Sequence, residues 1–373
     1  MSISRVNAFG QIVLDHLFQS QNYTGNIAFS SPSLYVMMSI ISAGLGKTTR
    51  PIISRLLGFD AYEFQYTPLW SNTGVGFLLS RIDAEIKSTI TAESVMFHSF
   101  NISSRFMSGS ENLIGLKYHK CNFFNIEKMT RKINIWAGKN TRGSIPNLYR
   151  HPLDNDTNMI VITTLYFFVD WLTPFNSQKT RNEKFTDDEG QELNVRMMKQ
   201  VKSYKIKMDR FHNISVIFIP MAKSGLYATI VLPRVGNSIK EVQKRIKWNK
   251  FRSYYTRAVN YYAELKLPRF KIITKNKLIK TFMHLNASEL FDPRVADFDF
   301  TTSKNVSIND WMQLTTVVVD ELSTAPNIED EPERSRRSVP YKFHVDRPFL
   351  FMLYSSHSAE VLLSVLVTNP NEN

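Results

Sequence analysis

The residues with the clearest chemical potential form one short basic run, Arg334-Ser335-Arg336-Arg337-Ser338, in which three arginines precede a small residue. Trypsin-like proteases hold an arginine before the cut bond, because a buried carboxylate in their pocket pairs with the guanidinium. Arginines at positions one, two and four before the bond also suit proprotein-processing proteases of the furin kind. From these residues alone, an exposed charged loop without function, or an activation site, is an equal alternative.

The surrounding elements predict that this run lies in a long loop. Residues 323–341 are strongly polar, and four acidic residues precede the arginines. Apolar runs that are typical of strands flank this segment, at 315–319 and 349–354. Loops of this length inside a compact domain are usually functional or disordered.

A second basic stretch covers residues 240–252. Its cationic side chains recur close to helical spacing, and they are Lys240, Lys244, Arg245, Lys247, Lys250 and Arg252. Such a run is most often a solvated helix face, and the alternative is a polyanion-binding strip. A heparin-like glycan would fit outside a cell. No recognised module supports a specific nucleic acid partner. The net charge of +13 favours polyanionic surroundings in general.

Other catalytic and metal-binding patterns are incomplete. Gly44-Leu45-Gly46-Lys47-Thr48 resembles the end of a phosphate-binding loop, but Ile41 stands where the first glycine belongs. The residues before it predict a helix, which Gly44 would close. The eight histidines are scattered, and the single cysteine, Cys121, excludes a disulfide framework and a multi-thiolate zinc site. We expect no enzyme activity, no metal and no cofactor.

The apolar pattern predicts an α+β fold in one domain covering residues 1–373, since no linker divides the chain. Helices are expected within 1–20, where Val6, Phe9, Ile12, Val13 and Leu17 fall on one face, and at 33–43, 76–87 and 128–139. Strands are expected at 158–168, 215–219, 227–232, 261–267, 315–319, 349–354 and 361–367. The pair 215–219 and 227–232 should be antiparallel around Lys223-Ser224-Gly225.

Targeting signals in the sequence are weak. No run of apolar residues is long enough to span a bilayer, and residues 1–20 do not form a signal peptide. Six Asn-x-Ser/Thr sequons offer glycosylation positions, at Asn22, Asn101, Asn155, Asn213, Asn286 and Asn305. Chance alone predicts a similar number, so the sequons decide little.

Taken together and in order, several sequence blocks resemble the serpin family along the whole chain. The most specific block is Leu165 to Trp171, with the sequence LYFFVDW. Further blocks lie at 26–33, 44–49, 133–136, 267–272 and 346–351. The resemblance implies three β-sheets, eight or nine helices and an exposed reactive-centre loop at about 321–345. It also implies a monomer that inhibits a serine protease, trypsin-like or furin-like, in the extracellular space. The missing signal peptide leaves a cytoplasmic location open.

The resemblance also assigns a mechanism and its residues. Glu321 matches the family's hinge glutamate, Pro348 matches the proline after the loop, and the bait bond falls at Arg337-Ser338, with Arg334 and Arg336 as further bait positions. The protease forms an acyl-enzyme at this bond, and the cut loop inserts into the main sheet before hydrolysis. The family places the hinge at Glu321, Ser323, Thr324, Ala325 and Pro326. Sheet opening is assigned to Trp171, Thr163 and Gln313.

Two features of the hinge depart from the family pattern. If Thr324 faces the core of a strand, Pro326 and Asp330 face it too, because alternate residues share a face. Proline has no N–H group to donate to the hydrogen-bond ladder of a sheet, and burying an unpaired carboxylate costs free energy. Thr163 also replaces the usual asparagine, and Gln313 a frequent histidine. The alternative to an inhibitor is therefore a non-inhibitory serpin, a binding module whose loop is only cut.

Overall fold

The computed structural model describes residues 2–123, 125–322 and 339–372. The chain divides into two compact units, which we treat separately. The first unit comprises residues 32–167 and 275–316, and the second comprises residues 2–31, 168–274 and 317–373. The boundaries between the units fall inside four elements: α2 (Ser31–Ala43), β4 (Met159–Phe168), β10 (Phe270–Lys277) and β11 (Asp310–Val319).

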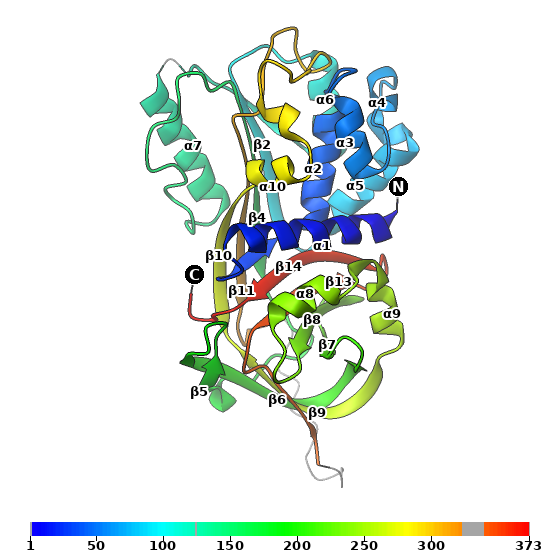
Figure 1. The fold of residues 1–373 in the computed structure, drawn as a ribbon, viewed down its shortest axis with the longest axis vertical. Coiled ribbons are helices and arrows are strands. Elements are labelled where there is room, and N and C mark those ends of the chain that lie inside the picture. Colours follow the sequence, from blue (N-terminus) through cyan, green and yellow to red (C-terminus); the bar gives the residue numbers. More distant parts are fainter. Residues whose placement is uncertain (1, 124, 323–338, 373) are drawn as a thin grey trace. The chain divides into compact units, whose positions relative to one another are not determined.

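The first unit is rich in helices. Its elements are α2 (Ser31–Ala43), α3 (Arg50–Leu57), α4 (Glu63–Tyr66), η1 (Trp70–Asn72), α5 (Gly74–Lys87), β2 (Thr91–His98), α6 (Ser104–Ile114), β3 (Lys117–Lys120), α7 (Ile126–Asn140), β4 (Met159–Phe168), α10 (Ile279–His284), η4 (Ser288–Phe291) and β11 (Asp310–Val319). The predicted helices at 33–43, 76–87 and 128–139 are confirmed as α2, α5 and α7. In Figure 1, α7 lies on the opposite side of β2 and β4 from α2, α3 and α5.

A five-stranded sheet carries the order β10-β11-β4-β2-β3, with β10 at Phe270–Lys277. The apolar run at 158–168 is confirmed as β4, which is buried from Met159 to Leu165, as a strand covered on both faces must be. β2 pairs antiparallel with β4 and parallel with β3. In this strand order β11 lies between β10 and β4 and is hydrogen-bonded to both.

The second unit holds most of the strands. Its elements are α1 (Ile3–Ser20), β1 (Ile27–Phe29), η2 (Ser177–Lys179), β5 (Arg181–Thr186), β6 (Glu192–Asp209), β7 (Ile214–Pro220), β8 (Leu226–Pro233), α8 (Ile239–Arg245), η3 (Trp248–Lys250), α9 (Phe251–Thr256), β9 (Val259–Pro268), β12 (Tyr341–His344), β13 (Phe349–Ser355) and β14 (Glu360–Val367). The expected antiparallel pair appears as β7 and β8, and Gly225 in its turn has a φ of 76°.

The long strand β6 joins two groups of strands into one nine-stranded sheet. The order is β1-β14-β13-β8-β7-β6-β9-β12, and β5 also pairs with β6. One end of β6 pairs with β7, while a longer stretch, Met197 to Ile206, pairs with β9. The described strands thus form two connected sheets, where the resemblance implied three. The pattern analysis missed β6, because its lysines interrupt the apolar residues that mark a strand.

The first helix buries one face, as expected, with one correction. Val6, Phe9, Val13 and Leu17 are buried, but Ile12 is 49% exposed. Gly10, Leu14 and Phe18 complete the buried face, so its centre is rotated away from Ile12. Among the helices that the structure describes, none is both long and apolar enough to cross a membrane.

Candidate functional site

The candidate site is the pair of strand ends that flank residues 323–338. β11 ends at Val319 and the chain is described to Leu322, then again from Val339, just before β12. The predicted bait and most of the predicted hinge lie outside the described residues: these are Ser323, Thr324, Ala325, Pro326, Arg334, Arg336, Arg337 and Ser338. Their assignment stays a prediction, and Glu321 is the hinge residue whose surroundings are seen.

Trp171 fastens the end of β11. Its indole Nε1 donates to the carbonyl oxygen of Asp320 at 2.7 Å, and its side chain is fully buried. Phe175 packs against the indole edge-on, with the ring centroids 5.3 Å apart. The strand pairing extends nearby, because the Val169 amide donates to the Val318 carbonyl at 3.0 Å. Trp171 therefore lies at the end of β11, and its role in sheet opening stays a prediction.

Glu321 is a nearly buried carboxylate with two different partners. The Thr180 hydroxyl donates to its Oε1 at 2.6 Å, and the Arg269 Nε lies 3.3 Å from its Oε2. Thr180 follows the short helix η2, and Arg269 lies between β9 and β10. Burying a carboxylate is tolerated only when its oxygens are paired, so this arrangement holds Glu321 in place just after the end of β11.

Thr180→Val should lower the free energy of unfolding by about 1–3 kcal/mol, because the valine leaves one oxygen of a buried carboxylate without a donor. Thr180→Ser keeps the hydroxyl and is the matched control, which should lose much less. Urea unfolding at neutral pH measures both variants. Equal losses in the two variants would show that packing of the Thr180 methyl, rather than the bond to Glu321, matters here.

The second strand end is also held by a side-chain contact. β12 runs parallel to β9, and the His344 Nε2 lies 2.8 Å from Glu264 Oε1. Lys199 Nζ lies 2.7 Å from the other oxygen of Glu264. Partial burial acts to raise the pKa of Glu264, but the bonds from Lys199 and His344 outweigh it and lower the pKa. Glu264 thus stays ionised and ties β12 to the sheet.

The two other residues assigned to sheet opening lie in the first unit. Thr163 is buried in β4, and its hydroxyl is 3.1 Å from that of Ser94 on the paired strand β2. Gln313 is buried in β11. Both lie inside the five-stranded sheet, and their role in sheet opening stays a prediction. The pattern analysis assigned no role to Thr180 or Arg269, the partners of Glu321.

The basic stretch is divided between separate elements. Lys240, Lys244 and Arg245 lie on α8, whereas Lys250 and Arg252 belong to η3 and α9, and Lys247 lies between them. The expectation of one continuous helical spacing is wrong, because Trp248 turns into the core and is fully buried. Lys240 Nζ lies 3.7 Å from the centre of the Tyr23 ring, and Lys244 Nζ lies 4.9 Å from it. This pair of lysines forms a compact cationic site.

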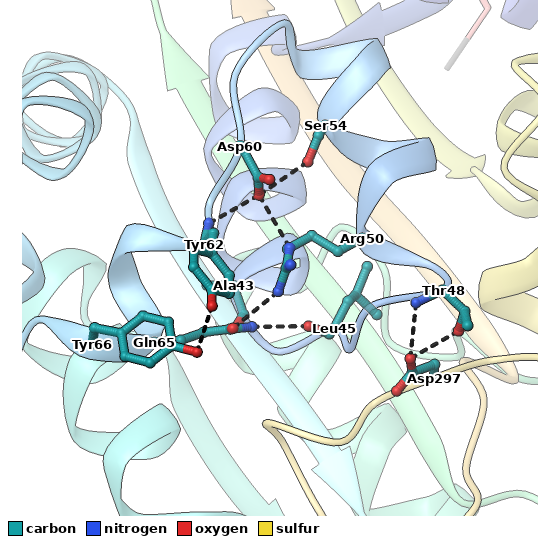
Figure 2. A network of polar contacts seen from close by, with 10 residues as sticks. All are labelled: Ala43, Leu45, Thr48, Arg50, Ser54, Asp60, Tyr62, Gln65, Tyr66 and Asp297. Atoms are coloured by element: carbon teal, nitrogen blue, oxygen red, sulfur yellow. Dashed lines mark hydrogen bonds and ion pairs between the residues drawn. The ribbon is translucent and has the colours of Figure 1, made fainter.

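The Gly44-to-Thr48 loop holds a carboxylate of its own chain. Figure 2 shows the amide and hydroxyl of Thr48 directed at Asp297, with distances to Oδ2 of 3.1 and 2.8 Å. A side chain at Gly46 would meet Asp297 Oδ1 at 1.9 Å. Burial acts to raise the pKa of Asp297, but these donors lower it. The loop is therefore a structural clamp after α2, in agreement with the sequence interpretation.

A buried arginine braces the next helix beside this clamp. Arg50 pairs with Asp60 at 3.1 Å and donates to Gln65 Oε1 at 2.9 Å. Gln65 in turn donates to the Leu45 carbonyl at 2.9 Å (Figure 2). Within the ranges that the structure describes, no group of three or more potential ligands could hold a metal ion. The network around Arg50 links α3 and α4 to the loop at Leu45.

Comparison with known proteins agrees with this architecture. The family model for Serpin (serine protease inhibitor) matches residues 4–370. Human Serpin B11 is 24% identical, over 94% of this chain and 95% of its own. The crystal structure of mouse protein-Z dependent protease inhibitor has a TM-score of 0.86 at 22% identity, covering 99% of this chain and 96% of its own. Native protease nexin-1 with heparin has a TM-score of 0.84 at 21% identity, covering 99% of both chains.

The chain belongs to the serpin family, and the serpin-like α+β fold is confirmed. Members of this family are serine protease inhibitors and generally not catalytic enzymes. The expectation that this chain is not an enzyme agrees with that.

Proposed function

We propose that this serpin inhibits a trypsin-like or furin-like serine protease and presents Arg337-Ser338 as its bait bond. Arg337 would fill the primary pocket of the protease, and Arg336 and Arg334 would favour proteases with acidic subsites. The supporting observation is the anchoring of both strand ends. Glu321 and Trp171 hold the end of β11, and the pairing of β12 with β9 holds the start of β12, so the described residues on both sides of the predicted bait are fixed in place.

Trapping requires that the cut loop becomes a strand. A segment that folds back from Leu322 along β11 must replace β4 or β10 as a hydrogen-bonded neighbour, since both sides of β11 are occupied. The strand gains a full ladder of backbone bonds in return. An acyl-enzyme formed at Arg337 would be carried along with the moving segment before water releases it.

The test is a mixture with trypsin and, separately, with a furin-type protease, followed by denaturing gel electrophoresis. A band at the summed mass is the expected result, because a covalent acyl-enzyme survives detergent. A clipped product alone, with a new N-terminus at Ser338, would mean that the bait is cut and the trap fails.

The second candidate is a non-inhibitory binding module. It is favoured by Pro326 and Asp330, because both residues make strand insertion energetically costly. In that case the family fold serves as a scaffold, and cleavage of the loop adds no strand to the sheet. The clipped product described above is the outcome that selects this function over inhibition.

The compact cationic site of Lys240 and Lys244 fits a heparin-like glycan as an additional partner. Arg245 lies beside them, but its guanidinium is 3.8 Å from the Glu241 carboxylate. This pairing leaves less of its positive charge for a glycan. Lys247, Lys250 and Arg252 extend the basic surface along the chain. Protease nexin-1, a protein of the same fold, was solved with heparin. A glycan and a trypsin-like target are both typical of the extracellular space, which favours that location.

A further inference from the structure

A cavity of about 790 Å³ lies in the first unit, and none of the residues that line it belongs to the anchors of the strand ends described above. Its walls come from three segments: the helix α7, the connector that follows α7 between residues 144 and 152, and the end of β10. Arg131 of α7, Arg150 of the connector and Lys275 of β10 each contribute a cationic side chain. This convergence from three parts of the chain is unlike a charged run on one helix face.

The charges in this cavity do not balance. Against the three cations stands one carboxylate, Glu127. In the parts of the chain that the structure covers, none of the three cations forms an ion pair. Lys275 Nζ donates to the carbonyl oxygen of Asn147 at 3.3 Å, a neutral partner. Partial burial, and then the positive charge of Arg150, lower the pKa of Lys275. Two like charges held together in this way favour an anion between them.

The cavity wall is also rigid. The Asn134 side chain donates to the Tyr149 carbonyl and accepts from the Tyr149 amide, both at 2.9 Å. The Tyr149 hydroxyl donates to Asp310 Oδ2 at 2.8 Å, which ties the connector to β11. Arg150 therefore extends from a backbone that is fixed at the preceding residue, Tyr149. A preorganised cation loses less conformational freedom on binding than a free surface lysine does.

We propose that the cavity between α7, residues 144–152 and β10 binds a small polyanion that carries phosphate or sulfate groups. The guanidinium groups of Arg131 and Arg150 match the oxygens of such groups in pairs, and Lys275 adds a third charge. The side chains of Ser144 and Asn147 lie in the same wall and offer neutral donors. A phosphorylated metabolite and a sulfated sugar unit share this chemistry, and they are the two sources to be distinguished.

The test is isothermal titration of the full chain at physiological salt with inorganic pyrophosphate and, separately, with a trisulfated heparin disaccharide. The pocket variant is Arg150→Gln with Lys275→Gln. The matched control, Lys128→Gln with Lys132→Gln, removes two exposed charges from α7, the helix that lines the cavity, at positions outside the cavity. Each cation that binds directly should contribute about tenfold in affinity. We expect roughly a hundredfold loss in the pocket variant and little change in the control.

A second control separates this cavity from the cationic site on α8. Lys240→Gln with Lys244→Gln should weaken retention on a heparin column and leave pyrophosphate binding unchanged. Tighter binding of pyrophosphate than of the disaccharide identifies a phosphorylated ligand, and the reverse order identifies a sulfated sugar. The proposal is overturned if the unmodified protein binds neither probe, or if either control loses as much affinity as the pocket variant. Thermal unfolding of all variants without ligand confirms that they are folded.

Discussion

Arg337→Ala should lower the rate constant with which a trypsin-like protease attacks this serpin by about 10⁴-fold. A pocket built around a buried carboxylate leaves that charge unpaired when the arginine is missing, and this penalty falls on the transition state. The measurement is the second-order rate constant for attack on the 337–338 bond, followed as covalent complex plus clipped product, together with the position of cleavage. Both follow from a bait at Arg337, whether the encounter ends in trapping or in hydrolysis.

Arg334→Ala is the matched control, since it removes the same side chain three positions upstream. Trypsin should react with this variant at nearly the original rate, because its main recognition is of the residue before the bond. A furin-type protease should react more slowly, since it also requires arginine at the fourth position. Cleavage that continues at 337–338 in Arg337→Ala at an unchanged rate would overturn the assignment of the bait.

The fold was predictable where apolar residues dominate an element. The strand β4 and the helix α2 can be predicted without tertiary information, because their largely apolar composition itself indicates burial on all sides. β6 was not predictable in this way. It alternates lysines with apolar residues over a strand that is half exposed, and it pairs with β7 and β9 at different points along its length. The prediction that Ile12 is buried was wrong for a related reason, since the sequence does not fix where the buried face of a helix ends.

The contacts of Glu321 were not predictable from the sequence. The resemblance placed Glu321 at the start of the loop, and the structure adds Thr180 and Arg269 as its partners. Those residues are distant in the chain, so spacing carries no signal for them. The basic stretch shows the opposite case. Its spacing indicated one helix, but the large apolar side chain of Trp248 took the core position and ended α8 before it.

Replacing Pro326 and Asp330 together with alanine should shift the reaction from cleavage toward trapping. In an inserted strand both residues would face the core with Thr324, where proline interrupts the ladder and the carboxylate loses its water. Proline alone costs about 3 kcal/mol in a regular element, by analogy with helices. If about half of that cost is felt in the barrier to insertion, the rate of insertion rises about tenfold. Densitometry of the gel measures the ratio of complex to clipped product.

The matched control is Asn327→Ala with Glu329→Ala, which changes the alternate positions of the same segment and also removes one carboxylate. These side chains would face solvent in the inserted strand, so the control should leave the ratio of complex to clipped product unchanged. The thermal midpoint of the loop-cleaved protein gives an independent readout, because a completed strand adds a ladder of hydrogen bonds and core contacts. A midpoint that rises by tens of degrees on cleavage of the unmodified protein would rule out the non-inhibitory function. An equal response of the two double variants would instead show that the alternation of facing residues does not control insertion.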